Sequence, residues 1–209
     1  MSSDRSAGGR PRDPELEARI LAATRQLLAE RGYRRLSIGA VARLAGTTRP
    51  TIYLRFAGKE ELATSAIAAM PVSDPLPVTA DIRADLVAEL RHFRTAITRP
   101  NGFSLVGTVL AEEQLTPRLA ASFRERLVLP RRRRLAATLH RGAGIGALRP
   151  GLDVEAVTGM LTGSLYAHHL AHGAIPEDWP ERVVDSLWPA LRSGGSAQPV
   201  EAEEVVRDR

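Results

Sequence analysis

Apolar residues recur along the chain at intervals of three and four, which places them on one face of an α-helix. In the first third this spacing predicts three helices, with inward-facing residues at Leu16, Ile20, Leu27 and Leu28, at Ile38, Val41, Ala42 and Ala45, and at Ile52 and Phe56. Gly32 and Gly46 are placed to end the first two helices, and Ser37 and Thr48 to cap the next two. A fourth helix is predicted to begin near Gly58.

The helical pattern resumes after a proline-rich break between Met70 and Thr79. Further helices are predicted at about 81–98, 103–114, 117–142, 153–172 and 177–192. Pro130 is expected to kink or split the helix that contains it. Because no apolar–polar alternation is long enough for a β-strand, we predict an all-α fold: an N-terminal three-helix helix-turn-helix domain and a C-terminal helical domain.

Composition and charge narrow the class of protein. The 209 residues contain no cysteine, which excludes disulfides and cysteine metal sites. Residues 1–62 hold 12 basic and 7 acidic residues, whereas the remainder holds 17 of each, so the whole net charge of +5 lies in the first third. That distribution is expected if only this segment faces nucleic acid. No secretory signal or membrane-spanning stretch is visible, which predicts a cytoplasmic protein that is not attached to a membrane.

The predicted second and third helices, joined by a tight glycine-containing turn, are typical of a helix-turn-helix. In that motif the second helix supports the third, whose first residues reach base edges in the major groove. Arg49 stands at this start, where a guanidinium can bind O6 and N7 of guanine; the alternative is a contact to phosphate or solvent. Tyr53 lies one turn further along, and its alternative role is a core tyrosine.

The residues themselves resemble the TetR family of bacterial transcriptional regulators. The resemblance runs without a gap from residue 19 to residue 62, through Leu27–Tyr33, Ser37–Gly46, Thr47–Phe56 and Ala57–Leu62. It implies a repressor that binds a palindromic double-stranded operator as a homodimer and is released by a small-molecule effector. The residues expected to bind DNA are Ser37, Thr48, Arg49, Pro50, Thr51, Tyr53 and Lys59. The chain departs from the family pattern at Gly58, a weaker helix cap, and at Gly39, which costs about 1 kcal/mol of helix stability relative to alanine.

Two later runs, 130–134 and 146–153, resemble more loosely the C-terminal domain of actinobacterial TetR-like regulators. This implies a helical ligand pocket and a dimer interface built from the last two long helices. The apolar residues expected on that interface are Val157, Leu161, Leu165, Val183, Val184, Leu187 and Leu191, with Trp188. Pocket residues are expected on the inner helix faces, and the effector is expected to be apolar. The candidates are Phe93, Phe103, Gly107, Leu110, Phe123, Met160 and Tyr166.

The expected organisation is a flexible basic arm at 1–13, a helix-turn-helix domain at 14–62 whose fourth helix continues to about 70, a ligand-binding and dimerisation domain at 71–192, and a disordered tail at 193–209. Two further functions were weighed. A DNA-binding dimer without an effector would have a filled C-terminal core. An enzyme would need a catalytic triad, a metal frame or a cofactor loop, and the sequence offers none, so we expect no enzyme and no cofactor.

Two clusters of polar residues, a histidine pair and a run of four arginines, are candidate functional sites. His168 and His172 are four residues apart on one predicted helix face, a spacing that suits zinc, but no third ligand is evident and histidines at an interface are the alternative. We therefore predict no metal site. The run Arg131–Arg134 sweeps about 300° around a helix, so its members cannot share one surface.

Overall fold

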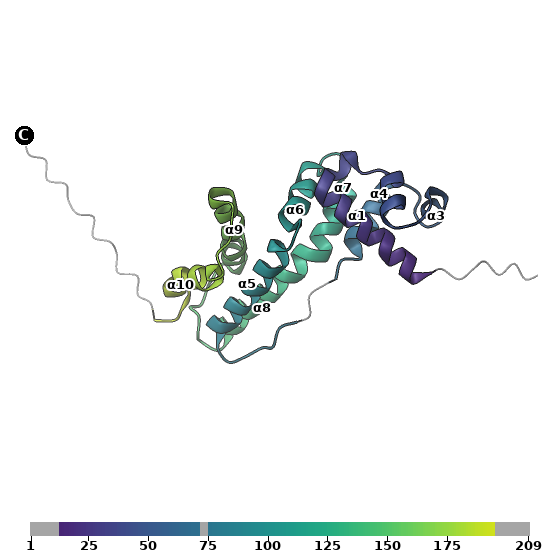
Figure 1. Ribbon diagram of the computed structural model, residues 1–209. Helices are drawn as coiled ribbons and strands as arrows, with labels where there is room; N and C mark the ends of the chain where they lie inside the picture. The colour runs from purple at the N-terminus through teal and green to yellow at the C-terminus, as the bar shows by residue number, and fades with distance from the viewer. Residues whose placement is uncertain (1–12, 72–74, 195–209) are drawn as a thin grey trace, which may run out of the picture. The chain divides into compact units, whose positions relative to one another are not determined.

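The computed structural model describes residues 13–71 and 75–194, and these residues form helices and no strand (Figure 1). One isolated antiparallel bridge joins Leu148 and Arg192. The predicted all-α fold is confirmed. The predicted basic arm, apart from Asp13, and the predicted tail beyond Gly194 lie outside the described residues. The described residues pack into two compact units, one formed by residues 13–71 and 97–130 and the other by 75–96 and 131–194.

The first unit is built around its longest helix. Its elements are α1 (Pro14–Arg35), α2 (Ile38–Leu44), α3 (Arg49–Tyr53), α4 (Lys59–Ala68), α6 (Gly102–Ala111), α7 (Pro117–Phe123) and the π-helical turn η1 (Arg124–Val128). Asp13 caps α1 by accepting hydrogen bonds from two backbone N–H groups of the first turn. Gly32 leaves the helical conformation with φ +75°, as expected for a helix-ending glycine, and a last helical turn follows it.

Helices α6 and α7 share a core with the N-terminal helices. Leu105, Val109 and Leu119 are buried in the same cluster as Ile20 and Leu28 of α1. Two side-chain hydrogen bonds reinforce this packing: the Thr108 hydroxyl of α6 donates to the carbonyl of Leu28 (3.1 Å), and the Ser122 hydroxyl of α7 donates to that of Thr64 (3.3 Å). Helices α6 and α7 therefore pack with the N-terminal helices, although they follow the predicted domain boundary at residue 71 in the sequence.

The helix predicted at 117–142 is divided into α7, η1 and α8 (Leu129–Gly144). Pro130 has no N–H group to donate to the carbonyl four residues earlier, so the α-helical ladder is broken there. Just before it, the Leu129 N–H group bonds to the carbonyl of Arg124, five residues back, which is the π-helical pattern. The expected disturbance at Pro130 is thus found as a widened turn on its N-terminal side.

The second unit contains α5 (Ile82–Thr98) up to residue 96, α8 from residue 131, α9 (Val154–His172) and α10 (Trp179–Leu191). Helices α5 and α8 run antiparallel side by side (Figure 1), joined by a buried ion pair between Glu89 and Arg134 and another between Asp85 and Arg141. The apolar side chains of this core are fully buried; they include Leu86, Leu90, Phe93, Leu135, Leu139, Leu161, Leu165 and Val184.

We expect the Asp85 cluster to make stability depend on pH. Burial raises the pKa of Asp85, but hydrogen bonds from Thr79 and Arg141 outweigh it, so the pKa lies below its usual value. A carboxyl whose pKa is lowered by folding stabilises the protein above its unfolded pKa, about 3.9, and loses this contribution as the pH falls through the folded value. Asp85→Asn should therefore melt below the wild type at neutral pH, and the gap should shrink below about pH 4. Melting curves between neutral pH and acid pH test this, and a gap that is constant over the whole range would contradict it.

Candidate nucleic-acid interface

Helices α2 and α3 form a helix-turn-helix whose turn is fixed by local chemistry. The Ser37 hydroxyl caps α2 by accepting from the Ala40 N–H (3.2 Å), and the Thr48 hydroxyl caps α3 by accepting from the Thr51 N–H (3.4 Å). Gly46 between them has φ +65°, a conformation that glycine adopts without strain. Both predicted caps are confirmed, and the two predicted DNA-contact threonines, Thr48 and Thr51, also bond to each other through their hydroxyls (2.9 Å).

The inner face of this motif is anchored in the core of the first unit. Val41 of α2 and Ile52 of α3 are fully buried, and Phe56 is 5% exposed. Because these residues fix the rotation of the short helix α3, the remaining side chains of α3 must point outward. Tyr53 is 56% exposed, which excludes the alternative of a core tyrosine.

The outward face of α3 carries the predicted contact residues. Arg49 and Pro50 in its first turn are exposed, as is Tyr53 one turn later. Leu54, immediately after the helix, is 80% exposed, an uncommon position for a large apolar side chain that nothing in its own chain covers. The helix thus presents one cation, one phenol and two apolar groups, a mixture that can contact phosphates, base edges and thymine methyl groups.

Gly39 of α2 makes room for the guanidinium of Arg49. A Cβ atom at position 39 would lie only 2.6 Å from Nη2 and 2.8 Å from Nε of Arg49. Sequence reasoning treated this glycine as a loss of helix stability and missed its second role. The only signal available was its unfavourable place within a short helix, because the neighbour across the turn depends on the folded geometry.

Lys59, the remaining predicted contact, lies in the first turn of α4 against the end of α1. Its ammonium donates to the carbonyl of Arg34 (3.1 Å) and lies 4.4 Å from the centre of the Tyr33 ring. It therefore joins α4 to α1, and its predicted phosphate contact stays a prediction. The helix cap that Gly58 does not provide is replaced in part by Glu61, whose carboxylate accepts from the Ala57 N–H.

The predicted pocket residues fall on both compact units. Phe103, Gly107, Leu110 and Phe123 belong to the first unit, and Phe93, Met160 and Tyr166 to the second. Leu110 and Met160 are 66% and 56% exposed, so the expectation that they lie on inner helix faces is wrong. Periodicity identifies an apolar stripe, but it does not show where that stripe stops and a solvent-facing or partner-facing surface begins.

Phe93 is the centre of the aromatic core of the second unit. It is 1% exposed, and its ring centre lies 6.0 Å from that of Tyr166 and 6.4 Å from that of Trp179. The guanidinium of Arg131 lies over the Phe93 ring at 4.0 Å. Burial raises the pKa of Tyr166, while the charge of Arg131 acts in the opposite direction.

The four consecutive arginines point to different partners, as their helical spacing predicted. Arg132 pairs with Glu155, Arg134 pairs with Glu89, and Arg133 is exposed. Arg131 contacts the aromatic core instead of a carboxylate.

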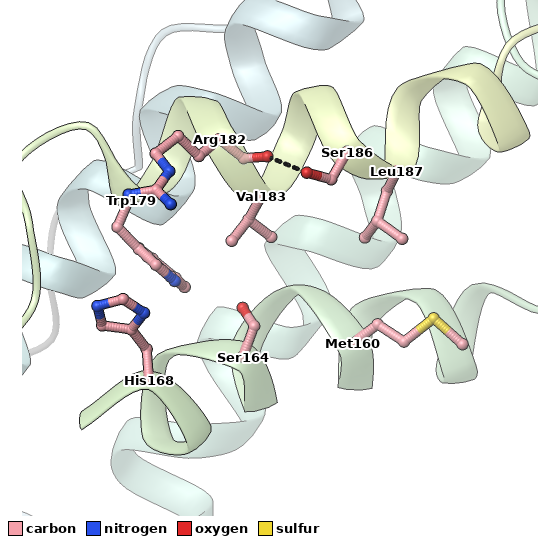
Figure 2. A pocket seen from close by; sticks show the side chains of 8 residues that line it. All are labelled: Met160, Ser164, His168, Trp179, Arg182, Val183, Ser186 and Leu187. Carbon is pink, nitrogen blue, oxygen red and sulfur yellow. Dashed lines mark hydrogen bonds between the residues drawn. The ribbon is translucent and has the colours of Figure 1, made fainter. Parts of the chain in front are cut away.

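An open groove of about 380 Å³ separates α9 from α10 (Figure 2). Half of its lining is apolar and half polar, with His168 and Arg182 together at one end (Figure 2): Met160, Ser164, His168, Trp179, Arg182, Val183, Ser186 and Leu187. In contrast, five residues of the expected dimer face are buried within their own subunit: Val157, Leu161, Leu165, Val184 and Leu191. The prediction is wrong for these five, because they fill the subunit's own core. Val183 and Leu187 line the open groove and Trp188 is half-buried, so their part in a dimer face stays a prediction.

His168 and His172 lie with their ring centres 4.6 Å apart on α9. Within residues 13–71 and 75–194, no group of three or more histidine, aspartate or glutamate side chains is arranged to hold a metal ion. None of the helices in these ranges is both long and apolar enough to cross a membrane.

Comparison with known proteins places this geometry in a family. Residues 20–66 match the family described as "Bacterial regulatory proteins, tetR family", and residues 76–187 match the "Tetracyclin repressor-like, C-terminal domain". The chain is 27% identical over 169 residues to the uncharacterised HTH-type transcriptional regulator YdeS of Bacillus subtilis, covering 80% of this chain and 85% of YdeS. It is 28% identical over 173 residues to the DNA-binding transcriptional repressor TetR of Mycobacteroides abscessus, covering 81% and 90% of the two chains.

The fold agrees with these sequence matches. The crystal structure of the TetR family transcription regulator SCO0332 superposes with a TM-score of 0.57 at 28% identity, covering 83% of this chain and 97% of the other. The two family matches together span the helix-turn-helix and the helices that follow it. This chain is therefore a member of the TetR family of DNA-binding transcriptional regulators.

Proposed function

We propose that this protein is a repressor that binds a palindromic operator as a homodimer and is released from it by a small-molecule effector. The observation that supports this most directly is the exposed start of α3, where Arg49 and Pro50 stand on a helix whose inner face is buried. A relative of similar length is named a transcriptional repressor, which supports repression over activation.

Each predicted contact has a role in this proposal. Arg49 binds guanine in the major groove, and Pro50 and Thr51 contact neighbouring bases. Tyr53 and Lys59 bind phosphates, while the capped ends of α2 and α3, at Ser37 and Thr48, direct N–H groups toward the backbone of the DNA. These contacts are distributed as in other helix-turn-helix proteins, in which phosphate contacts position the protein and base contacts specify the sequence.

Dimerisation is proposed through the outward faces of α9 and α10. Small residues recur every fourth position along α9, at Gly159, Gly163, Ala167 and Ala171, and the exposed Met160 flanks them. Residues four apart share one helix face, and small side chains there permit close approach of a second helix. Two such helices from each subunit would form a four-helix bundle.

We expect Gly163→Leu to weaken the dimer without harming the subunit. No atom of the same chain lies within 4 Å of a Cβ atom at this position, so the leucine fits the isolated fold. In a close-packed interface it would cost about 1–3 kcal/mol, which is about 5- to 150-fold in the dimer dissociation constant. Sedimentation equilibrium measures this constant, with Ala137→Leu on the exposed side of α8 as the matched control. Equal dissociation constants for the two variants would show that the dimer forms elsewhere.

Effector release requires that a movement in the C-terminal helices is passed on to the helix-turn-helix formed by α2 and α3. Within the first unit, α6 is joined to α1 at two points one turn apart, the Thr108–Leu28 hydrogen bond and the ion pair between Glu112 and Arg34 (3.4 Å). A movement of α6 would therefore act on α1. An effector produces it only by binding the released state more tightly than the DNA-bound state.

Release is tested by titrating operator DNA with the protein in the presence and absence of a compound that binds the free protein. The proposal predicts weaker operator binding by about 1–3 kcal/mol for each bound effector. A compound that binds tightly and leaves operator affinity unchanged would contradict release and favour a DNA-binding dimer without an effector.

A further inference from the structure

Most of the described arginines of the second unit form ion pairs or side-chain hydrogen bonds, and those that are exposed and unpaired lie in solvent. Arg134 donates to both carboxylate oxygens of Glu89, at 3.0 Å each. Arg94 donates to the backbone carbonyls of Pro176 (2.6 Å) and Ile175 (3.0 Å). Arg132 is paired with the exposed carboxylate of Glu155, and Arg141 with the buried carboxylate of Asp85. These side chains have evident structural roles.

Among the arginines of the second unit that are not exposed to solvent, Arg131 is the exception within the described residues. It forms no ion pair there and donates no hydrogen bond, and its one specific contact is with the face of Phe93. The nearest acid, Glu89, has both oxygens occupied by Arg134. Burial lowers the pKa of Arg131, although a guanidinium remains charged at neutral pH. A largely buried charge without a counter-ion is costly, and such groups are concentrated at functional sites.

The nitrogen atoms of Arg131 are still open to a ligand, because none of them is a fully enclosed donor that lacks a partner. The ring of Phe93 fixes the guanidinium while leaving its N–H groups unused. Tyr166 stands beside it, and because burial raises the pKa of Tyr166, its phenol keeps its proton at neutral pH. The site therefore combines an uncompensated positive charge with aromatic surface.

This chemistry selects the class of ligand. A guanidinium binds a carboxylate through two parallel hydrogen bonds, and such charge-assisted bonds are stronger than neutral ones. Phe93 is enclosed in the core, whereas Tyr166 is only half-buried, so the ring of Tyr166 suits an apolar or aromatic body. A cationic ligand is disfavoured, because Arg131 already covers the face of Phe93 and would repel a second positive charge.

We propose that Arg131 binds the carboxylate of a small organic acid, which is the effector of this regulator. This inference rests on the proposed effector-released function and adds a charged group to an effector that sequence reasoning expected to be apolar. The acid would neutralise the buried charge, and its body would lie against the half-buried ring of Tyr166.

The test uses fluorescence of the full-length protein, which contains two tryptophans. Trp188→Phe leaves Trp179, whose ring packs against Phe93, as the only reporter. The probes are benzoate, phenylpropionate and hexanoate, with benzamide as the neutral counterpart, benzyltrimethylammonium as the cation and inorganic phosphate as the free oxyanion. We expect at least one of the acids to change the emission saturably and to bind more tightly than the amide, the cation and phosphate.

Substitutions then separate binding at Arg131 from general effects. Arg131→Gln should weaken binding of that acid about tenfold or more, and Arg131→Lys, which keeps the charge but not the planar fork, by less. Arg133→Gln, at the exposed neighbouring position, should leave it unchanged. Melting curves confirm that each variant is folded.

Three results would overturn the inference: no binding of any acid up to about 10 mM, binding of benzamide or the cation as tight as that of the acids, or equal affinity in Arg131→Gln. Failure of the proposed function gives a different pattern. An acid that binds through Arg131 and leaves operator affinity unchanged would contradict the proposed effector release, but it would support the binding site at Arg131. A compound that releases the operator and binds Arg131→Gln as tightly as the wild type would support effector release and contradict the binding site at Arg131.

Discussion

Arg49→Ala is expected to abolish most sequence-specific DNA binding. If Arg49 binds a guanine through two hydrogen bonds, its loss costs about 1–3 kcal/mol in each half-site. The two half-sites of a dimer are far apart, so the losses should add to about 2–6 kcal/mol. Affinities for the operator and for random duplex DNA, measured at one fixed salt concentration, give the result. Tyr53→Phe serves as the comparison, and it should weaken both kinds of DNA alike.

The substitution Gly39→Ala tests the role of Arg49 in operator binding without changing Arg49 itself. The added methyl group must displace the guanidinium of Arg49, which stands only 2.6 Å from its position. Because alanine favours a helix, the variant should melt at least as high as the wild type while binding the operator less tightly. Equal losses on specific and random DNA in Arg49→Ala would show that Arg49 does not read a base. Unchanged operator affinity in Gly39→Ala would show that Arg49 binds DNA without its place against Gly39.

The largest expected effect on stability is at the ion pair between α5 and α8. Arg134→Met leaves the carboxylate of Glu89, 6% exposed as a residue, buried without its counter-ion. Removing one partner of such a pair typically costs about 3–5 kcal/mol, so we expect a large loss in the free energy of unfolding, measured by chemical denaturation.

The double variant Glu89→Leu with Arg134→Met separates the pair from the packing around it. Replacing both charges with apolar side chains removes the unpaired carboxylate, so most of the stability should return. If the double variant is as unstable as Arg134→Met alone, the loss comes from packing and the ion pair is not its cause.

The structural features that depend on residues close together in the chain could be predicted from the sequence. The caps at Ser37 and Thr48, the turn at Gly46 and the buried positions Val41 and Ile52 all follow from local rules of helix spacing and termination. The same rules located the break near Pro130, because a proline disrupts a helix wherever the helix lies.

The features that sequence reasoning missed depend on residues that are distant in the chain. The fit of Arg49 against Gly39 requires the angle between two helices, and the placement of Arg131 on Phe93 requires the packing of α8 on α5. Apolar periodicity marks a face of α9, but the face at Leu161 and Leu165 fills the subunit's own core while Met160 on another side is exposed. A single-chain pattern does not show which apolar face meets a partner.

The most direct test of a dimeric regulator that reads DNA through α3 is selection of binding sites from a random duplex library. The account predicts an enriched inverted repeat whose half-sites are centred about 34–36 Å apart, one turn of DNA. Arg49→Ala should enrich repeats of the same spacing that have lost their preference at one base step in each half. An enriched site without two-fold symmetry, or no enrichment above random DNA, would contradict it.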